Sequence, residues 1–159
     1  MIGFYAGSFD PFTNGHLSIV KKASKCFEKV IIGIGFNAEK TPRIDKNMMK
    51  IAIEETIKEE KIANVEVVLY NCLTIEEAKR CNADILIRGL RNGTDYQYEE
   101  TVASINEIHS GLDTCYFRAG DLGHLSSSVV IELYNYDEDI RSYVPKPIYE
   151  LLEKKKMNK

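Results

Sequence analysis

Short apolar segments alternate along this chain with longer segments whose apolar residues recur at helical spacing. The short segments predict five strands at residues 2–6, 30–34, 65–69, 85–87 and 114–117. The longer ones predict helices at residues 15–27, 45–61, 74–81 and 94–109, a fifth from Ser126 or Ser127 to residue 133, and a last one after Pro145. Mostly apolar strands joined by helices indicate a parallel sheet with helices on both faces. We therefore predict a single α/β domain, residues 1–159, built on an open five-stranded parallel sheet and ending in a frayed basic tail at 153–159.

Local signals mark where three of these helices begin. Asp45 is expected to cap the second helix, because its carboxylate accepts readily from amides of a first helical turn. Thr74 and Thr94 each stand three residues before Glu or Gln, which is the spacing of a capping box. Four residues of the second helix are expected to face the core: Met48, Met49, Ala52 and Ile53.

Composition narrows the class of protein. The net charge of -3 counts against a nucleic-acid binder, and no apolar run approaches the ~20 residues of a membrane span. The first residues lack the basic and long apolar segments of a signal peptide, so we expect a cytoplasmic protein. The four cysteines form no C-x-x-C pair and no zinc-type spacing, so we expect free, at least partly buried thiols and no metal site formed by the chain itself.

The loops that follow the strands are the candidate sites, because ligands of parallel α/β sheets bind beyond the carboxyl ends of the strands. After the first strand, a turn-rich loop begins with Gly7, which lets the backbone approach a phosphate closely. It leads to His16 in the first turn of a helix, where backbone amides favour an anion. The loop at 37–43 holds Lys40, and on its own it is typical of an exposed turn with solvated charges.

Two further loops at the same sheet edge are also suited to anions. After the fourth strand, Arg88 and Arg91 flank Gly89 in a pattern that fits bidentate phosphate contact. After the fifth strand, three serines at 126–128 combine hydroxyls with the free amides of a helix start. Each loop alone is explained by ordinary turns and caps, but four of them at one edge predict a phosphate-binding site.

This predicted site is rich in cationic and amide donors, but it has no obvious general base. A phosphate nucleophile needs none near neutrality, because its second pKa is ~6. The protein then only has to hold two phosphate groups in line and neutralise the charge that develops between them.

The residues from Gly7 to His16 read G-S-F-D-P-F-T-N-G-H and resemble the signature of the nucleotidylyltransferase superfamily, which carries H-x-G-H or T-x-G-H after the first strand. Over nearly its full length, the chain resembles the bacterial phosphopantetheine adenylyltransferases within that superfamily. The other matching pieces are Lys40, residues 64–68, I-R-G-L-R at 87–91, Asp95-Tyr96 with Tyr98-Glu99, Asn106, the serines at 126–128 and Glu132. The resemblance implies a Rossmann-like fold.

The resemblance also implies a reaction. ATP would donate its adenylyl group to 4'-phosphopantetheine, giving dephospho-coenzyme A and pyrophosphate, with Mg²⁺ held through the ATP phosphates. The acceptor phosphate would attack the α-phosphate directly and in line. The family likeness further implies a homohexamer and feedback binding of coenzyme A.

Residue roles follow from the same resemblance. Catalytic roles are implied for His16, Lys40, Ser8 and Arg91. ATP binding is implied for Ser8, Phe9, His16, Gly89, Leu90, Arg91, Glu99, Ser126, Ser127 and Ser128. Acceptor binding is implied for Ser8, Lys40, Leu73, Thr74, Arg88, Asn106 and Glu132.

The chain departs from the family pattern where positive or aromatic side chains usually stand. Residues 121–125 lack the aromatic that precedes the serine run, and His124 is expected at the surface instead. Ile131, Thr41 and Met49 occupy positions that are usually basic. These losses thin the positive charge around the phosphates and predict a weaker hold on ATP.

Other functions stay open at this stage. The same fold could serve a different acceptor, such as nicotinamide mononucleotide or glycerol 3-phosphate, or act as a non-catalytic module that binds a nucleotide or coenzyme A. A dinucleotide-dependent oxidoreductase fits less well, because Gly33-Ile34-Gly35 lacks the third glycine and follows the wrong strand.

Overall fold

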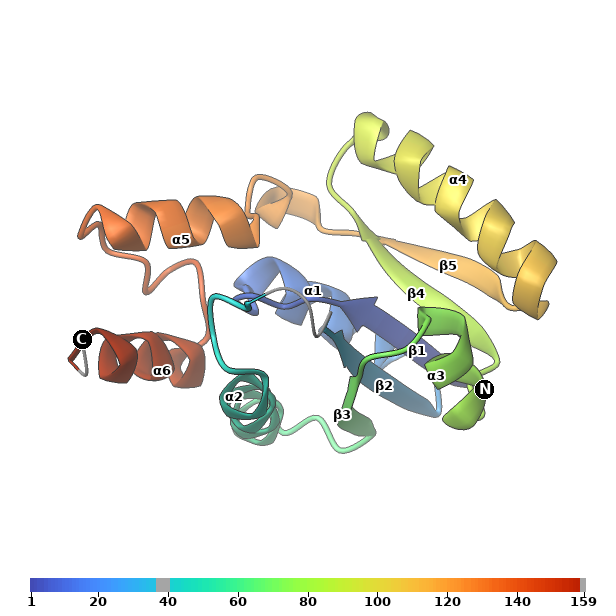
Figure 1. Cartoon of the computed structure of the whole chain (residues 1–159), viewed down its shortest axis with the longest axis horizontal. Helices are drawn as coiled ribbons and strands as arrows, with labels where there is room; N and C mark the ends of the chain where they lie inside the picture. The colour runs from blue at the N-terminus through green and yellow to red at the C-terminus, as the bar shows by residue number, and fades with distance from the viewer. Residues whose placement is uncertain (37–40, 158–159) are drawn as a thin grey trace.

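The computed structural model describes residues 1–36 and 41–157. It contains five strands: β1 (Ile2–Gly7), β2 (Lys29–Gly35), β3 (Val65–Tyr70), β4 (Ile85–Leu90) and β5 (Asp113–Arg118). They form one sheet in the order β3-β2-β1-β4-β5, and every neighbouring pair is parallel (Figure 1). The predicted five-stranded parallel sheet is therefore confirmed.

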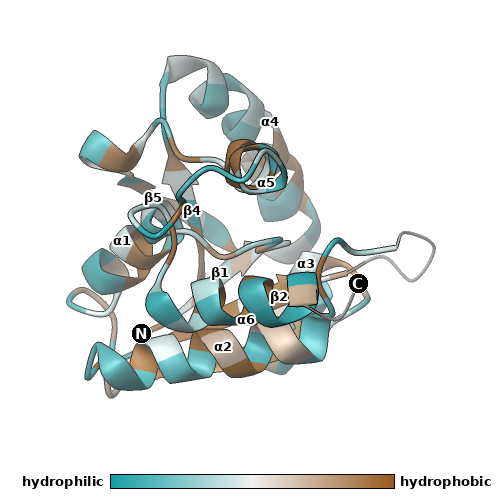
Figure 2. Cartoon of the chain, turned by 90° about the vertical axis from the view of Figure 1, so that its left-hand side faces the viewer, coloured by the Kyte–Doolittle hydropathy of each residue, from teal (hydrophilic) through white to brown (hydrophobic). Residues whose placement is uncertain are grey.

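Helices cover both faces of this sheet. They are α1 (Asn14–Ala23), α2 (Lys46–Glu59), α3 (Thr74–Arg80), α4 (Gly93–Ser110), α5 (Ser127–Asn135) and α6 (Lys146–Met157), with a 3-10 turn at Gly120–Leu122. On one face, Tyr5, Ile32 and Ile87 pack into a core with α1, α2 and α6. On the other, Phe4 and Leu86 pack into a second cluster near α3. Figure 2 shows α2 and α6 running side by side, and α4 lies against β4 and β5.

Some helices end at other residues than the sequence predicted. Helix α1 ends at Ala23, and the chain turns there before it reaches Phe27. The last helix continues to Met157, where we expected a frayed tail from residue 153. Contacts of two of its lysines tie it to the fold: Lys155 donates to the carbonyl of Arg43, and Lys156 pairs with Asp137.

The predicted caps of α2 and α5 are confirmed, since Asp45 accepts from the amide of Met48 and Ser126 from that of Val129. The two threonine capping boxes are wrong. Leu73 precedes α3 without a side-chain cap, and the Thr74 hydroxyl instead shares a hydrogen bond of 2.9 Å with the Tyr70 hydroxyl.

At α4 the cap lies two residues earlier than predicted. The Asn92 side chain accepts from the amide of Asp95 at 2.9 Å, so Thr94 stands inside the helix. In α2, Met49, Ala52 and Ile53 are buried as predicted, but Met48 is 46% exposed because it lies on the outer face of the first turn.

Among the described residues, no helix is both long and apolar enough to cross a membrane. All four cysteines are free, as expected, but Cys26 is exposed rather than partly buried.

Candidate active site

The candidate site lies where the connections of the sheet diverge. Strands β1 and β4 are neighbours, but the chain leaves β1 toward β2 on one side and leaves β4 toward β5 on the other. Such a switch point opens a crevice at the carboxyl edge of a parallel sheet. Here the β1–α1 loop, the start of α4 and the start of α5 enclose a cavity of about 380 Å³, which we call the His16 pocket.

The β1–α1 loop is shaped by an aromatic side chain folded back over it. Phe9 is buried with a φ of 45°, a left-handed backbone conformation that is strained for a bulky residue. Its ring lies so close to Gly7 that an added Cβ would stand 2.8 Å from the ring. Glycine is therefore needed at position 7 for Phe9, whereas the sequence analysis assigned it to phosphate approach.

His16 is built into the start of α1. Thr13 caps the helix by accepting from the His16 amide at 3.3 Å, and the Thr13 amide donates back to Nδ1 of His16 at 3.0 Å. Because Nδ1 accepts this hydrogen bond, the ring proton of the neutral imidazole resides on Nε2. The ring packs against Phe9 and Phe12, which hold its orientation.

The His16 ring is neutral over the physiological range. Desolvation, with the Arg91 charge second, lowers the pKa of His16 to about 4. Its Nε2–H is therefore a fixed hydrogen-bond donor in the pocket, and it neither charges nor loses its proton near pH 7.

This shift predicts a pH dependence of folding. Between pH 6.5 and about 4, the unfolded chain binds a proton at His16 and the folded chain does not, so His16 lowers stability as the pH falls through this window. The free energy of unfolding in urea should drop less between pH 7 and pH 5 in His16→Asn than in the wild type. An equal drop in both proteins would contradict the assignment.

Both predicted arginines line the His16 pocket, and each is already paired with a carboxylate. Arg88 donates from Nε and Nη2 to Glu99 at 2.5 and 2.8 Å, and from Nη1 to the carbonyl of Ala6 at 3.1 Å. Arg91 donates from Nε and Nη2 to Asp95 at 2.8 and 3.0 Å. Each guanidinium keeps unused N–H groups, so it remains able to contact a phosphate.

The start of α5 closes the pocket from the other side. Ser126 caps the helix, and Ser127 donates from its hydroxyl to the carbonyl of Pro11 at 2.7 Å, which ties α5 to the β1–α1 loop. The first turn of a helix presents amides without helical partners and the positive end of its dipole. This end of the pocket therefore favours an anion.

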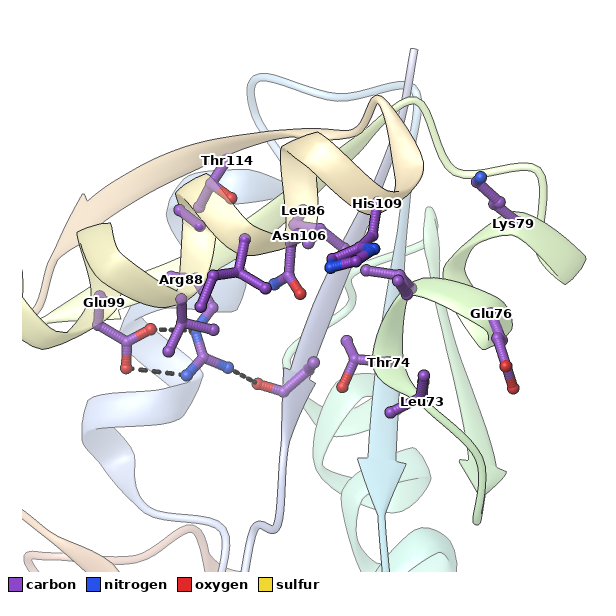
Figure 3. A pocket seen from close by; sticks show the side chains of 15 residues that line it. Leu73, Thr74, Glu76, Lys79, Leu86, Arg88, Glu99, Asn106, His109 and Thr114 are labelled. Carbon is purple, nitrogen blue, oxygen red and sulfur yellow. Dashed lines mark hydrogen bonds and ion pairs between the residues drawn. The ribbon is translucent and has the colours of Figure 1, made fainter.

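A second, larger cavity of about 690 Å³ adjoins the first, and we call it the Thr74 pocket. Leu73 and Thr74 lie on one side of it, and Asn106 and His109 of α4 lie on the other (Figure 3). The buried hydroxyl of Thr114, which also lines it, has no hydrogen-bond partner among the described residues. Arg88, Glu99 and Ala6 line both cavities, so the Arg88–Glu99 pair forms their common wall.

The two cavities collect most of the predicted site residues. The His16 pocket is lined by Ser8, Phe9, His16, Arg88, Gly89, Arg91, Glu99, Ser126 and Ser127. The Thr74 pocket adds Leu73, Thr74 and Asn106. Leu90 and Ser128 line neither cavity, and Glu132 is exposed on α5 away from both. Lys40 lies outside the described residues.

Sequence reasoning missed several residues that shape the site. Thr13 was noted only as part of a motif, although its spacing to His16 is that of a capping box. Asp95 was noted only as part of a matching piece, and it holds Arg91. Lys46 is buried behind the β1–α1 loop and donates to the carbonyl of Ser8 at 2.9 Å. Lys46 stands in the first turn of α2, and nothing in the sequence around it indicates a contact with the β1–α1 loop.

Known proteins resemble this chain in sequence and fold. Residues 4–142 match the model of the cytidylyltransferase-like family. The chain is 38% identical over 153 residues to phosphopantetheine adenylyltransferase of Lachnoclostridium phytofermentans, covering 95% of this chain and 93% of that protein. It is 39% identical to the Streptococcus pneumoniae enzyme of that name, covering 98% of this chain and 96% of the enzyme. The chain is 40% identical to phosphopantetheine adenylyltransferase of Cytophaga hutchinsonii, covering 91% of this chain and 96% of that protein.

A solved structure agrees at the level of the fold. A Vibrio parahaemolyticus protein assigned as a nicotinate-nucleotide adenylyltransferase superposes with a TM-score of 0.70 at 14% identity, covering 96% of this chain and 91% of that one. The sequence resemblance to adenylyltransferases is thus confirmed by close relatives, and the Rossmann-like sheet by a distant one. The chain belongs to the phosphopantetheine adenylyltransferase family, a branch of the cytidylyltransferase-like proteins.

Proposed function

We propose that this protein transfers the adenylyl group of ATP to 4'-phosphopantetheine and releases pyrophosphate. One observation carries the proposal: a neutral His16 with its donor fixed on Nε2 stands in an anion-binding pocket that shares a wall with a larger, partly apolar cavity. The small pocket suits the phosphates of a nucleotide, and the larger one suits the arm of a long acceptor. Relatives that are 38–40% identical to this chain are named phosphopantetheine adenylyltransferase, after this activity.

The chemistry needs no base from the protein. An oxygen of the acceptor phosphate forms a bond to the α-phosphorus of ATP while the bond from that phosphorus to the bridging oxygen breaks, and pyrophosphate leaves with the electron pair. His16 donates from Nε2 to a non-bridging oxygen of the α-phosphate, where charge grows in the transition state. The start of α5, with Ser127 and Ser128, receives the leaving pyrophosphate.

We assign roles to the remaining predicted residues from the family resemblance, and the cavities that they line support most of these roles. Ser8 and Arg88 hold the acceptor phosphate, and Leu73, Thr74 and Asn106 line the path of its arm. For Lys40, outside the described residues, the family resemblance alone suggests a part in holding that phosphate. Gly89, Arg91 and Glu99 surround the nucleotide from the end of β4, the following turn and α4, and Leu90, which lines neither cavity, adjoins them at the end of β4. Glu132 receives no role, because it faces solvent away from both cavities.

Mg²⁺ fits this site as a partner of ATP rather than as an ion held by the chain. The two carboxylates of the His16 pocket, Asp95 and Glu99, are each engaged by an arginine. The described residues include no group of three His, Cys, Asp or Glu side chains placed to hold a metal. Phosphate oxygens and water would therefore supply the ligands, and the ion would neutralise charge on the phosphates.

A pyrophosphate-release assay tests the proposal. The protein is incubated with ATP and, in turn, 4'-phosphopantetheine, nicotinamide mononucleotide and glycerol 3-phosphate, each with and without Mg²⁺. Release should be fastest with 4'-phosphopantetheine and should require the metal. Faster release with another acceptor would reassign the substrate, and tight binding of ATP or coenzyme A without release would indicate a non-catalytic module.

The outer face of α4 supports a homo-oligomer, which we take to be the hexamer that the family resemblance implies. The helix has 18 residues and none is buried, and Ile108, which lines neither cavity, is exposed on it. Its inner side lines the Thr74 pocket, so coenzyme A binding there would lie next to the contact between subunits. The proposed substrates are cytoplasmic metabolites, in keeping with the compartment expected for the chain.

This surface gives a prediction. Ile108 is 82% exposed in the single chain, and Ile108→Asp should break a contact between apolar faces. Light scattering should give the wild type a mass several times the chain mass of 18.1 kDa and the variant a smaller one. A wild-type protein that stays monomeric at micromolar concentration would contradict the proposal.

A further inference from the structure

The segment that leads into α2 is fixed against the β1–α1 loop, beside the start of α5. The carboxylate of Asp10 accepts from the amide of Arg43 at 2.9 Å and from that of Ile44 at 3.0 Å. These two bonds hold the backbone of Arg43 in place, whatever side chain stands there. The backbone at position 43 is therefore held beside the β1–α1 loop.

The guanidinium of Arg43 spans the gap between two anion-binding loops. It donates from Nη1 to the carbonyl of Asp10 at 3.3 Å and from Nη2 to the hydroxyl of Ser128 at 3.4 Å. Both contacts are long, and Nε makes none with the described residues. Within residues 1–36 and 41–157, no carboxylate forms an ion pair with it, whereas Arg88 and Arg91 are each held by one.

Arg43 therefore brings an exposed positive charge to the first turn of α5. Ser128 follows the capping Ser126 by two residues, so its hydroxyl and the free amides of that turn stand beside the guanidinium. The neighbouring cation, Lys46, does not compete for the same role. Its amine is buried, donates to the carbonyl of Ser8 at 2.9 Å and lies 3.9 Å from Asp10.

We propose that Arg43 is a further nucleotide-binding residue, which together with Ser128 holds the β- and γ-phosphates of ATP and the pyrophosphate that leaves. This inference rests on the proposed function for the identity of the ligand. It also changes the expectation of a weak hold on ATP, because Arg43 supplies positive charge at the end of the site where Ile131 supplies none. A bidentate contact to phosphate is the use for which a guanidinium is best suited.

The test compares two nucleotides that differ only at this end. Dissociation constants of Mg²⁺-ATP and of AMP are measured by calorimetry for the wild type, Arg43→Met and Arg141→Met. Arg141 is a matched control, because it is an exposed arginine paired with Asp139 at 2.7 Å and lines neither cavity. Arg43→Met should bind ATP about tenfold or more weakly and AMP within twofold of the wild type, while Arg141→Met changes neither.

Other outcomes separate this inference from the proposed function. An ATP affinity within twofold of the wild type in Arg43→Met, or an equal loss for AMP, would overturn the role of Arg43. Unchanged thermal melting of the variant would show that the fold is intact, as the two bonds to the backbone predict. Failure of the wild type to release pyrophosphate would remove the proposed reaction, yet the comparison of ATP with AMP would still decide where Arg43 binds.

Discussion

Replacing His16 with alanine is expected to lower kcat for pyrophosphate release by about 10²- to 10³-fold. The variant loses a donor whose direction is set by the start of α1, through the hydrogen bond from the Thr13 amide to Nδ1 at 3.0 Å. Because the interaction strengthens as charge grows on the α-phosphate, KM for ATP should change much less than kcat. Steady-state assays at saturating ATP and 4'-phosphopantetheine measure both constants.

The same variant should also lose some stability, since His16 closes the capping box of α1 and packs on two aromatic rings. Loss of a cap costs about 1 kcal/mol. Asp45→Ala is a matched control, because it removes the cap of α2 at a comparable cost and touches neither cavity. If Asp45→Ala lost as much kcat as His16→Ala, the effect would be one of folding. If His16→Ala kept the wild-type kcat, His16 would have no part in the chemistry.

Replacing Arg88 with methionine is expected to lower kcat/KM for 4'-phosphopantetheine by about 100-fold, because a charged and bidentate contact to its phosphate is lost. The change also leaves Glu99, whose side chain is only 15% exposed, without its partner. Breaking a fully buried pair costs about 3–5 kcal/mol, and the 30% exposure of Arg88 should place this one below that range. Urea unfolding measures the loss.

A double variant separates the two effects. Arg88→Met combined with Glu99→Gln removes the unpaired carboxylate and should recover most of the stability, but not the use of the acceptor. If the double variant regained kcat/KM as well, the role of Arg88 would be confined to neutralising Glu99. If Arg88→Met alone kept its kcat/KM, the acceptor phosphate would bind elsewhere.

The sequence was sufficient to predict a five-stranded parallel sheet, because five apolar segments alternate with segments whose apolar residues recur at helical spacing. Few folds accommodate that alternation. It also predicted most of the pocket, since the carboxyl ends of parallel strands share one edge and the loops with His16, Arg88 and Ser126 follow three of them. What it missed are contacts between segments distant in the sequence. Asp10 binds the backbone at Arg43, and this contact fixes a loop that the sequence suggested was only solvated against the β1–α1 loop.

Some predictions about individual residues failed for reasons that their immediate sequence does not reveal. Thr74 had the spacing of a cap, but Tyr70 at the end of β3 offered its hydroxyl a partner, and tertiary contact outweighed the local preference. Glu132 lies on the same helix as the pocket serines but beyond its first turn, and it lines neither cavity, so its predicted role in acceptor binding stays a prediction.

The wall shared by the two cavities has a consequence for acceptor choice. Since one guanidinium–carboxylate pair borders both, the two ligands of the proposed reaction would meet at this pair. A flexible acceptor can enter the reaction by its tip alone, with the remainder extending along α4 toward Asn106 and His109. If the proposed function is correct, we expect a preference for long, narrow acceptors: a short phosphate ester would leave the larger cavity empty, and an ester that is bulky beside the phosphate would not reach the nucleotide.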